Sequence, residues 1–382
     1  MNEQSLLQHQ VQTTLDQLDL IEGWLDHPAI NAQMRQRARA SFRSEIKTQR
    51  LAWQALQQTL NQNNVSLSSC WDQLRQLHAA CQFLFREFSA FWHGALTRNA
   101  GIDHHLCHVA DALLDELSQR CGLTWNRFTI LADAEQFFDL VGIIRLPFPE
   151  TTFWTLPLAA HEFGHFVAKE MQERSGGRRN YPIEAFIQQE GQADPRRIAH
   201  LNDLFADVFA AYSLGPAYAY AMLLLRLDPA SPDTFNHPSS ARRAHIILKT
   251  LNLLGADQPM PSFAAVADWL GAQWRNLRQS ANQPPDLDNA EQQQLNSWAT
   301  RLVQLLHNNL LDEAAYNRWP RAASLATNLM SGQEMGAICR PDDALTDVLN
   351  AAWRCRLENW NQANDIGVQA MAACLHLARH HG

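Results

Sequence analysis

The segment Ala159–Met171 reads AAHEFGHFVAKEM, and it places ionisable side chains in a stretch that otherwise has the apolar pattern of a buried helix. Burying such groups costs free energy unless they are paired or bind a metal. His161 and His165 lie four residues apart, so on a helix both imidazoles project from one face, about one turn from each other. The pattern H-E-x-x-H therefore predicts a metal-binding helix, with Glu162 beside the two ligands.

Imidazole is a good ligand for zinc, which polarises a carbonyl group and lowers the pKa of a bound water molecule. Glu162 follows His161 by about 100° around the helix, where it is placed to take a proton from that water and pass it to a leaving amine. We therefore expect zinc-dependent hydrolysis, with His161 and His165 as metal ligands and Glu162 as the general base. A chance match is the alternative in a chain with 16 histidines, but Phe163 and Val167 give the helix a separate packing face.

A third ligand is needed, and a helix with two carboxylates follows some forty residues later. Asp203 and Asp207 occur in the sequence DLFAD at the start of an apolar run. Unpaired carboxylates there would be costly, so we expect one to bind the metal and the other to accept the second ring N–H of a ligand histidine. A helix-capping role would explain Asp203 but not Asp207, which lies well inside the run. His200 is a further candidate ligand, although its place ahead of the apolar helix suggests a loop.

The segments HEFGH, DLFAD and HPSSARR follow one another in the order H-E-x-x-H, E-x-x-A-D and H-P-x-x-x-x-R. This order resembles the gluzincin metallopeptidases of the CAAX prenyl endopeptidase and heat-shock membrane protease type, over about residues 157–254. The resemblance implies a zinc cofactor, with Asp203 as third ligand where that family has glutamate and Asp207 as the partner of a ligand histidine. It also places His237 and Arg243 near the site, where they could bind a substrate carbonyl or the oxyanion of a tetrahedral intermediate.

This sequence departs from that family in two respects. Aspartate is one methylene shorter than glutamate, so the helix must approach the metal more closely, or Asp207 could be the ligand instead of Asp203. Those relatives are mostly anchored in membranes, whereas the apolar run Leu204–Leu225 carries Asp207 and is interrupted by Gly215 and Pro216. We therefore interpret the run as two successive buried helices and expect no integral membrane span.

The same relatives place an edge strand ahead of the metal helix, along which an extended substrate lies by β-augmentation. Val141–Leu146 is the best strand candidate, being short and β-branched and followed by Pro147. An ordinary core strand is the equal alternative. Trp154 could line the cleft, although a packing role is the simpler interpretation.

We expect a mainly helical fold with a small β-sheet, organised as a zincin-like metallopeptidase core flanked by helical regions. Residues 1–100 have apolar residues at helical spacing, with breaks at 26–28 and 61–64, and predict antiparallel helices. Residues 101–257 mix helices with strand-like runs and carry the metal-binding segments. Residues 258–382 return to helix, with a turn at 282–286, and the polar stretch 178–195 reads as a loop.

Composition limits the partners and the compartment. Lysine and arginine number 31 against 39 acidic residues, a net charge of −8, so a nucleic acid is not an expected partner. The seven cysteines are odd in number and contain no C-x-x-C pair, which favours a reducing compartment. The first residues, MNEQSLLQHQVQ, have no secretory-signal pattern. We therefore expect a cytoplasmic protein that acts on a protein or peptide, with helical flanks that could form a homo-oligomer or bind a partner.

Two other functions fit the same residues. One is a metal-dependent amidohydrolase acting on a non-peptide amide, and the other is a non-catalytic interaction protein with a structural metal. Glu162 argues against the second, because a structural zinc is usually held by four protein ligands and needs no general base. A second histidine cluster, HHLCH at 104–108, has the same spacing but lacks the glutamate, and a polar helix start explains it equally well.

Overall fold

The computed structural model describes residues 3–28, 36–62, 66–125, 128–132, 136–138, 143–147, 150–173, 180–256 and 262–381. The chain is mainly helical with a small sheet, as expected. It forms two compact units, Met1–His104 with Asn126–Phe148, and His105–Trp125 with Pro149–Gly382. The strand segment thus groups with the N-terminal helices, and residues 105–125 group with the part of the chain from residue 149 onward.

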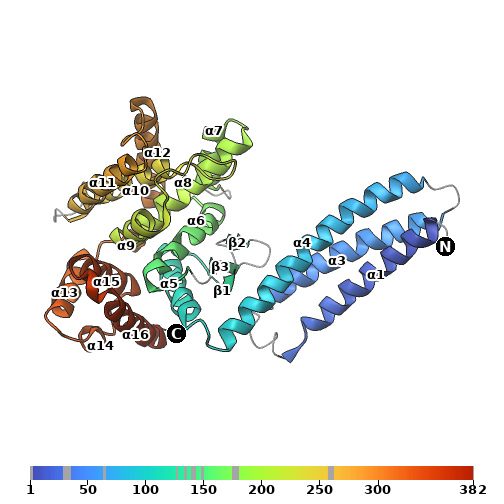
Figure 1. Ribbon diagram of the computed structural model, residues 1–382, viewed down its shortest axis with the longest axis horizontal. Coiled ribbons are helices and arrows are strands. Elements are labelled where there is room, and N and C mark those ends of the chain that lie inside the picture. The colour runs from blue at the N-terminus through green and yellow to red at the C-terminus, as the bar shows by residue number, and fades with distance from the viewer. Residues whose placement is uncertain are drawn as a thin grey trace. The chain divides into compact units, whose positions relative to one another are not determined.

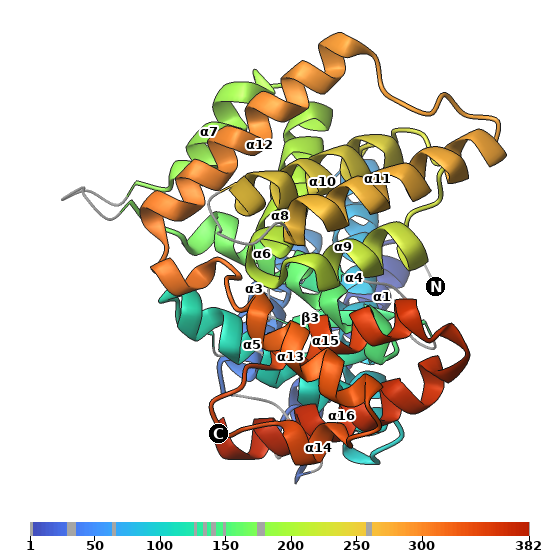
Figure 2. The ribbon, with the colours of Figure 1, turned by 90° about the vertical axis from the view of Figure 1, so that its left-hand side faces the viewer.

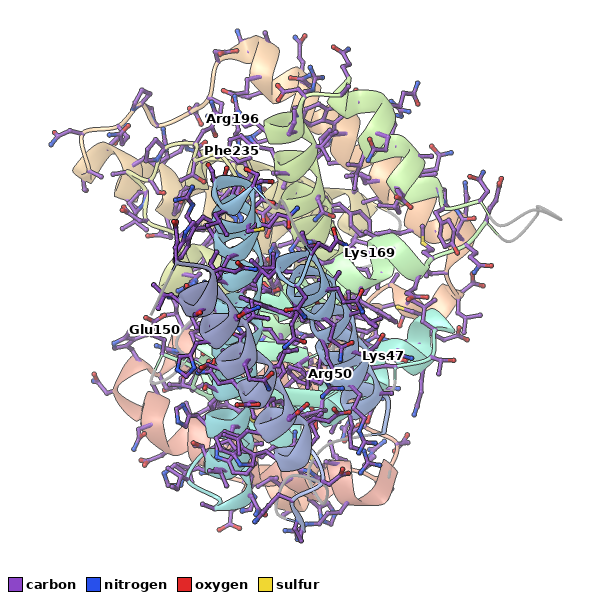
Figure 3. All side chains as sticks on the ribbon, turned by 90° about the vertical axis from the view of Figure 1, so that its right-hand side faces the viewer. Lys47, Arg50, Glu150, Lys169, Arg196 and Phe235 are labelled. Atoms are coloured by element: carbon purple, nitrogen blue, oxygen red, sulfur yellow. The ribbon has the colours of Figure 1, made fainter. Side chains whose placement is uncertain are left out.

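The first unit is built on helices α1 (Glu3–Trp24), α3 (Gln36–Leu60) and α4 (Leu67–Asn99), which lie side by side in Figure 1. The amide of Gln4, near the start of α1, donates to the carbonyl of Leu60 at the end of α3. Arg50, labelled in Figure 3, pairs with Asp19 (2.7 Å) and with Glu22 from the opposite end of α1. These contacts make α1 and α3 antiparallel, and both helices end at the breaks that the sequence predicts.

The first unit also contains the sheet, whose described strands are β1 (Phe128–Ala132), β2 (Gln136–Phe138) and β3 (Ile143–Pro147), in the order β1-β3-β2. The strand predicted at 141–146 is confirmed for 143–146, while residues 141 and 142 lie outside the described residues. Strand β3 pairs in parallel with β1 and antiparallel with β2, so it is the central strand. Of the two roles left open by the sequence, an edge strand and an ordinary core strand, the described sheet supports the second. A substrate cannot add to β3 by β-augmentation, because its backbone groups already pair on both sides.

The second unit is helical in its described part. Its first half contains α5 (Leu106–Cys121), the 3-10 helix η1 (Phe153–Leu158), α6 (Ala159–Glu170), α7 (Pro182–Gly191), α8 (Pro195–Leu214), α9 (Pro216–Ala221), the π-helical turn η2 (Met222–Arg226) and α10 (Ser240–Ala256). The rest contains α11 (Ser262–Ser280), α12 (Asn289–Asn309), η3 (Asp312–Ala314), α13 (Trp319–Met330), α14 (Met335–Ile338), α15 (Leu345–Glu358), η4 (Trp360–Gln362) and α16 (Ala363–His381). Helix α10 packs against α8 and lies alongside α11 (Figure 2). The predicted loop at 178–195 was wrong for α7.

The apolar run Leu204–Leu225 forms two buried helices, as the sequence predicts. Gly215 ends α8 with a φ of 63°, a conformation that strains any residue with a Cβ, and Pro216 begins α9. Asn350 of α15 bridges the break, since it accepts a hydrogen bond from the Ala217 amide and donates to the carbonyl that ends α8, both at 2.9 Å. Within the described ranges, no helix combines the length and apolar character needed to cross a membrane.

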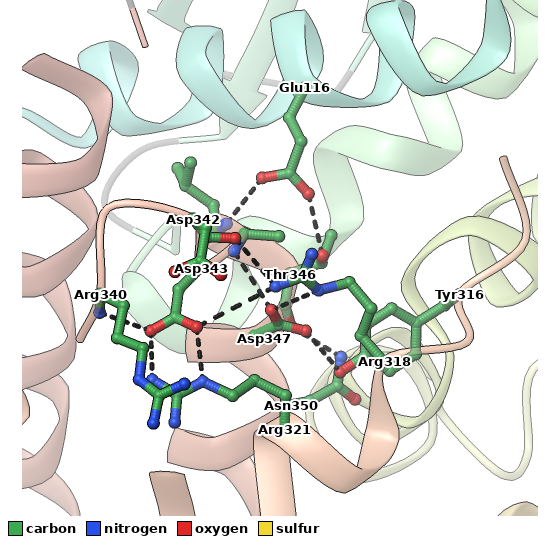
Figure 4. A network of polar contacts seen from close by, with 12 residues as sticks. Glu116, Tyr316, Arg318, Arg321, Arg340, Asp342, Asp343, Thr346, Asp347 and Asn350 are labelled. Atoms are coloured by element: carbon green, nitrogen blue, oxygen red, sulfur yellow. Dashed lines mark hydrogen bonds and ion pairs between the residues drawn. The ribbon is translucent and has the colours of Figure 1, made fainter. Parts of the chain in front are cut away.

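A network of polar side chains joins α15 to α5 and to the segment before α13 (Figure 4). Asp347 accepts hydrogen bonds from Arg318 Nε (2.8 Å) and from the hydroxyl of Tyr316 (3.2 Å). Glu116 of α5 accepts from the Leu345 amide (2.6 Å) and from the Thr346 hydroxyl (2.8 Å). These buried charges are therefore paired, and they anchor the N-terminal end of α15.

Candidate metal centre

Helices α6 and α8, which carry the segments HEFGH and DLFAD, contact each other through small residues. A Cβ added to Gly164 of α6 would lie 2.8 Å from the Cα of Ala206 and 3.2 Å from its Cβ. Glycine inside HEFGH and alanine inside DLFAD thus allow α6 and α8 to pack closely. This close approach compensates for the short aspartate side chain, because it carries Asp203 toward the two histidines of α6.

The packing of Gly164 gives a direct test. Gly164→Ala is expected to destabilise the protein by about 1–3 kcal/mol, because the new methyl group overpacks against a backbone atom. It should also weaken zinc binding by moving the two helices apart. Gly271→Ala on α11 is the matched control, since its Cβ would meet nothing closer than 3.6 Å and should stabilise the helix by about 0.5–1 kcal/mol. Urea unfolding measures the free energy of unfolding of both variants. Equal changes in the two would contradict the close packing of Gly164 against Ala206.

His161, His165 and Asp203 bring one ligand atom each within 4.8 Å of one another. Nε2 of His161 lies 3.2 Å from Oδ1 of Asp203, and Nε2 of His165 lies 4.0 Å from the same oxygen. The two imidazole rings are 5.0 Å apart and nearly perpendicular. Ligand atoms around a tetrahedral zinc ion lie about 3.3 Å from one another, so the three groups need only small adjustments to hold one.

One carboxylate oxygen of Asp203 is buried without a hydrogen-bond donor among the described residues. The residue is 3% exposed, and its Oδ2 accepts no hydrogen bond from the part of the chain that the structure describes. The nearest positive group is Nε of Arg243, at 3.5 Å. A buried carboxylate oxygen without a donor is costly, and two imidazoles with a carboxylate are a donor set that suits zinc. The residues present therefore fit the metal expected from the sequence.

Asp207 lies behind the opposite nitrogen of His161. Its Oδ1 is 3.0 Å from His161 Nδ1, whereas Asp203 faces Nε2. Arg243 donates to both oxygens of Asp207 at 2.8 Å, and the Tyr218 hydroxyl donates to Oδ1 at 2.5 Å. Asp207 is thus completely buried and fixed, and it can hold His161 with Nδ1 protonated and Nε2 toward Asp203. Of the two aspartates, the geometry favours Asp203 as the ligand.

His165 has an equivalent support in Asn202. The side-chain amide of Asn202 lies 3.0 Å from His165 Nδ1. Amide oxygen and nitrogen are interchangeable by a flip, and with the oxygen toward the ring the amide accepts Nδ1–H and leaves Nε2 for a metal. Neither Asn202 nor Tyr218 was predicted as a site residue. In the sequence, Asn202 could have been noticed as a polar residue next to Asp203, and Tyr218 as a hydroxyl group inside an otherwise apolar run.

The remaining predicted residues occupy different places around the centre. Arg243, on α10, is buried and committed to Asp207, so its geometry is that of a positioning residue. His237 has a side chain that is 64% exposed, with Nδ1 at 3.5 Å from Asp203 Oδ1. Glu162 is buried in the first turn of α6, beside His161. Nε2 of His200 is 2.9 Å from the carbonyl oxygen of Thr234, and His200 is not among the three residues whose ligand atoms come together.

The buried charges shift the protonation of both histidines in the absence of a metal. Burial lowers the pKa of His161, but Asp207 and Asp203 outweigh it and raise that pKa to about 10. Burial and the neighbouring His161 lower the pKa of His165 to about 4. Burial alone would raise the pKa of Asp203, yet Arg243 and His161 hold it well below its usual value. At neutral pH a metal ion therefore competes with a proton on His161, while His165 and Asp203 are ready to bind.

A cavity of about 350 Å³ is lined by residues of α8, α10 and α12, but not by His161, Glu162, His165 or Asp203. His200 and Leu204, which lie close to Asp203 in the sequence of α8, contribute to its wall, as does Pro238, which follows His237. Arg197, also in the wall, lies over the ring of Trp298 at 5.6 Å.

Comparison of the chain with protein-family models, with curated proteins and with solved structures gives no match.

Proposed function

We propose that the chain is a zinc-dependent metallopeptidase that hydrolyses peptide bonds of a protein or peptide. The observation that carries the proposal is the meeting of His161, His165 and Asp203, with a buried oxygen of Asp203 that accepts no hydrogen bond from the described residues. Three protein ligands are typical of catalytic zinc, because they leave a coordination position open. The order of the three segments around this centre supports a relation to the gluzincins.

The residues around the centre have separate tasks in this proposal. Zinc, when bound, would polarise the scissile carbonyl and acidify a water molecule. Glu162 accepts a proton from the attacking water and delivers it to the leaving nitrogen, so that the peptide bond breaks with the addition of one water. His237, on the exposed side of Asp203, donates to the developing oxyanion. Arg243 and Tyr218 hold Asp207, which in turn orients His161.

The cavity, the flanking helices and the cysteine content bear on the substrate and the compartment of the proposed peptidase. The cavity lined by α8, α10 and α12 would take a part of an extended substrate away from the cleaved bond. The helices outside the centre would select substrates or mediate self-association. The odd number of cysteines, without a C-x-x-C pair, favours a reducing compartment such as the cytoplasm for the proposed peptidase.

Metal analysis combined with a protease assay tests the proposal. The purified protein should carry close to one zinc per chain and should cleave an unfolded protein such as reduced casein. A chelator should stop cleavage, and added zinc should restore it. Stoichiometric zinc without cleavage of any peptide bond would instead favour a non-peptide amide substrate or a structural metal, and the absence of zinc binding would refute the proposal.

His237→Gln tests the residue on the exposed side. Because its side chain is largely exposed, the substitution should leave the thermal midpoint and the zinc content unchanged. Loss of one oxyanion donor should lower kcat by about 10²–10³-fold. His108→Gln, at an exposed position of α5, is the matched control and should have full activity. Unchanged kcat in His237→Gln would exclude His237 from the reaction.

A further inference from the structure

Arg356 of α15 lies among three tryptophan rings in the second unit. Its guanidinium carbon is 4.6 Å from the ring centroid of Trp154, 4.8 Å from that of Trp353 and 4.5 Å from that of Trp360. Cation–π contacts attract the positive charge of a guanidinium group to the faces of aromatic rings. They supply no oxygen acceptor for its N–H groups.

Those N–H groups find no partner in the described part of the chain. Arg356 is 8% exposed, and its Nε and one terminal nitrogen are buried without an acceptor. The indole Nε1 of Trp353, one of the three rings, is also buried without an acceptor. Three buried donors therefore belong to two neighbouring side chains, and no oxygen of the described residues accepts from them.

The other buried arginines differ from Arg356 in this respect. Arg145 pairs with Glu87, and Arg278 donates to the carbonyl oxygens of Pro284 (2.7 Å) and Pro229 (3.0 Å). Burial lowers the pKa of Arg356, and no carboxylate offsets this effect. A buried cation with unmade hydrogen bonds is destabilising, which indicates that its acceptor comes from outside the described residues.

We propose that Arg356 and the indole N–H of Trp353 bind a small oxyanion, the carboxylate or phosphate group of a ligand. A guanidinium group binds such groups by two parallel hydrogen bonds in its plane. Trp360 is 58% exposed, so one wall of the site lies at the surface. The site is separate from the metal ligands and does not depend on the proposed peptidase activity.

Titration of the full chain with sodium phosphate and with sodium acetate tests the site, with sodium chloride at equal ionic strength as reference. Either oxyanion should raise the thermal midpoint in a saturable way, because it binds only the folded protein. Arg356→Met should weaken this binding by at least about tenfold. Arg354→Met, which breaks only the surface pair with Glu358, should leave it unchanged. The two salts distinguish a phosphate-bearing from a carboxylate-bearing ligand.

Two further variants keep the test decisive. An oxyanion could also bind at the metal centre, so the titration is repeated in His161→Ala, where the saturable rise should persist. In buffer without oxyanion, Arg356→Met should match or exceed the wild-type midpoint, since it removes a buried cation that has no acceptor. If Arg356→Met does not fold, Trp360→Ala replaces it, and its exposed position should preserve the fold while binding weakens. Equal responses to chloride and oxyanions, or a response that survives these substitutions, would overturn the proposal.

Discussion

Glu162→Gln is expected to lower kcat for peptide hydrolysis by about 10²–10⁴-fold while the zinc content stays at one per chain. Glutamine has the shape of glutamate but cannot accept the proton of the attacking water. The substitution leaves His161, His165 and Asp203 in place, so the metal should still bind. The side chain is buried in the first turn of α6, where an amide of equal size causes little rearrangement.

The measurements for Glu162→Gln are zinc content, thermal midpoint and the rate of cleavage of an unfolded protein. Glu184→Gln, at an exposed position in the first turn of α7, is the matched control and should have the wild-type rate. A Glu162→Gln protein that binds zinc and cleaves at the wild-type rate would exclude Glu162 as the base. A protein that has no hydrolytic activity before or after the substitution would favour a structural metal.

His161→Ala should abolish stoichiometric zinc binding and, with it, all cleavage. His161 contacts Asp203 through Nε2 and Asp207 through Nδ1. Its loss leaves too few donors for a stable site, so zinc affinity should fall by more than the factor of about 10–100 that is usual when a supporting residue is removed. Chelator competition measures the affinity directly.

Substitution of the two aspartates decides which one is the ligand. Asp203→Asn should resemble His161→Ala, whereas Asp207→Asn should weaken zinc binding by only about 10–100-fold, because it disturbs the orientation of His161. The two residues lie on the same helix, and the substitutions are chemically identical, so each controls for the other. A larger loss of zinc in Asp207→Asn than in Asp203→Asn would reverse the assignment.

The helical parts of the fold could be predicted from local sequence patterns. Breaks at 26–28 and 61–64 were predicted because helix ends depend on residues that are close in sequence, and α1 and α3 end there. The position of β3 within the sheet could not be predicted from the sequence. Its pairing with β1 and β2 joins segments whose order in the sheet no local pattern specifies, so the sequence left an edge strand and a core strand as equal alternatives.

The sequence by itself determined that two histidines share one helical face and that two aspartates share another, because helical periodicity places residues four apart together. Only the tertiary structure decided that Asp203 faces Nε2 of His161 and Asp207 faces Nδ1. That choice depends on the contact between Gly164 and Ala206 and on Arg243, which reaches Asp207 from α10. The physical reason is that periodicity sets the direction of a side chain around its own helix axis, whereas the distance and rotation between helices come from packing contacts between residues far apart in the chain.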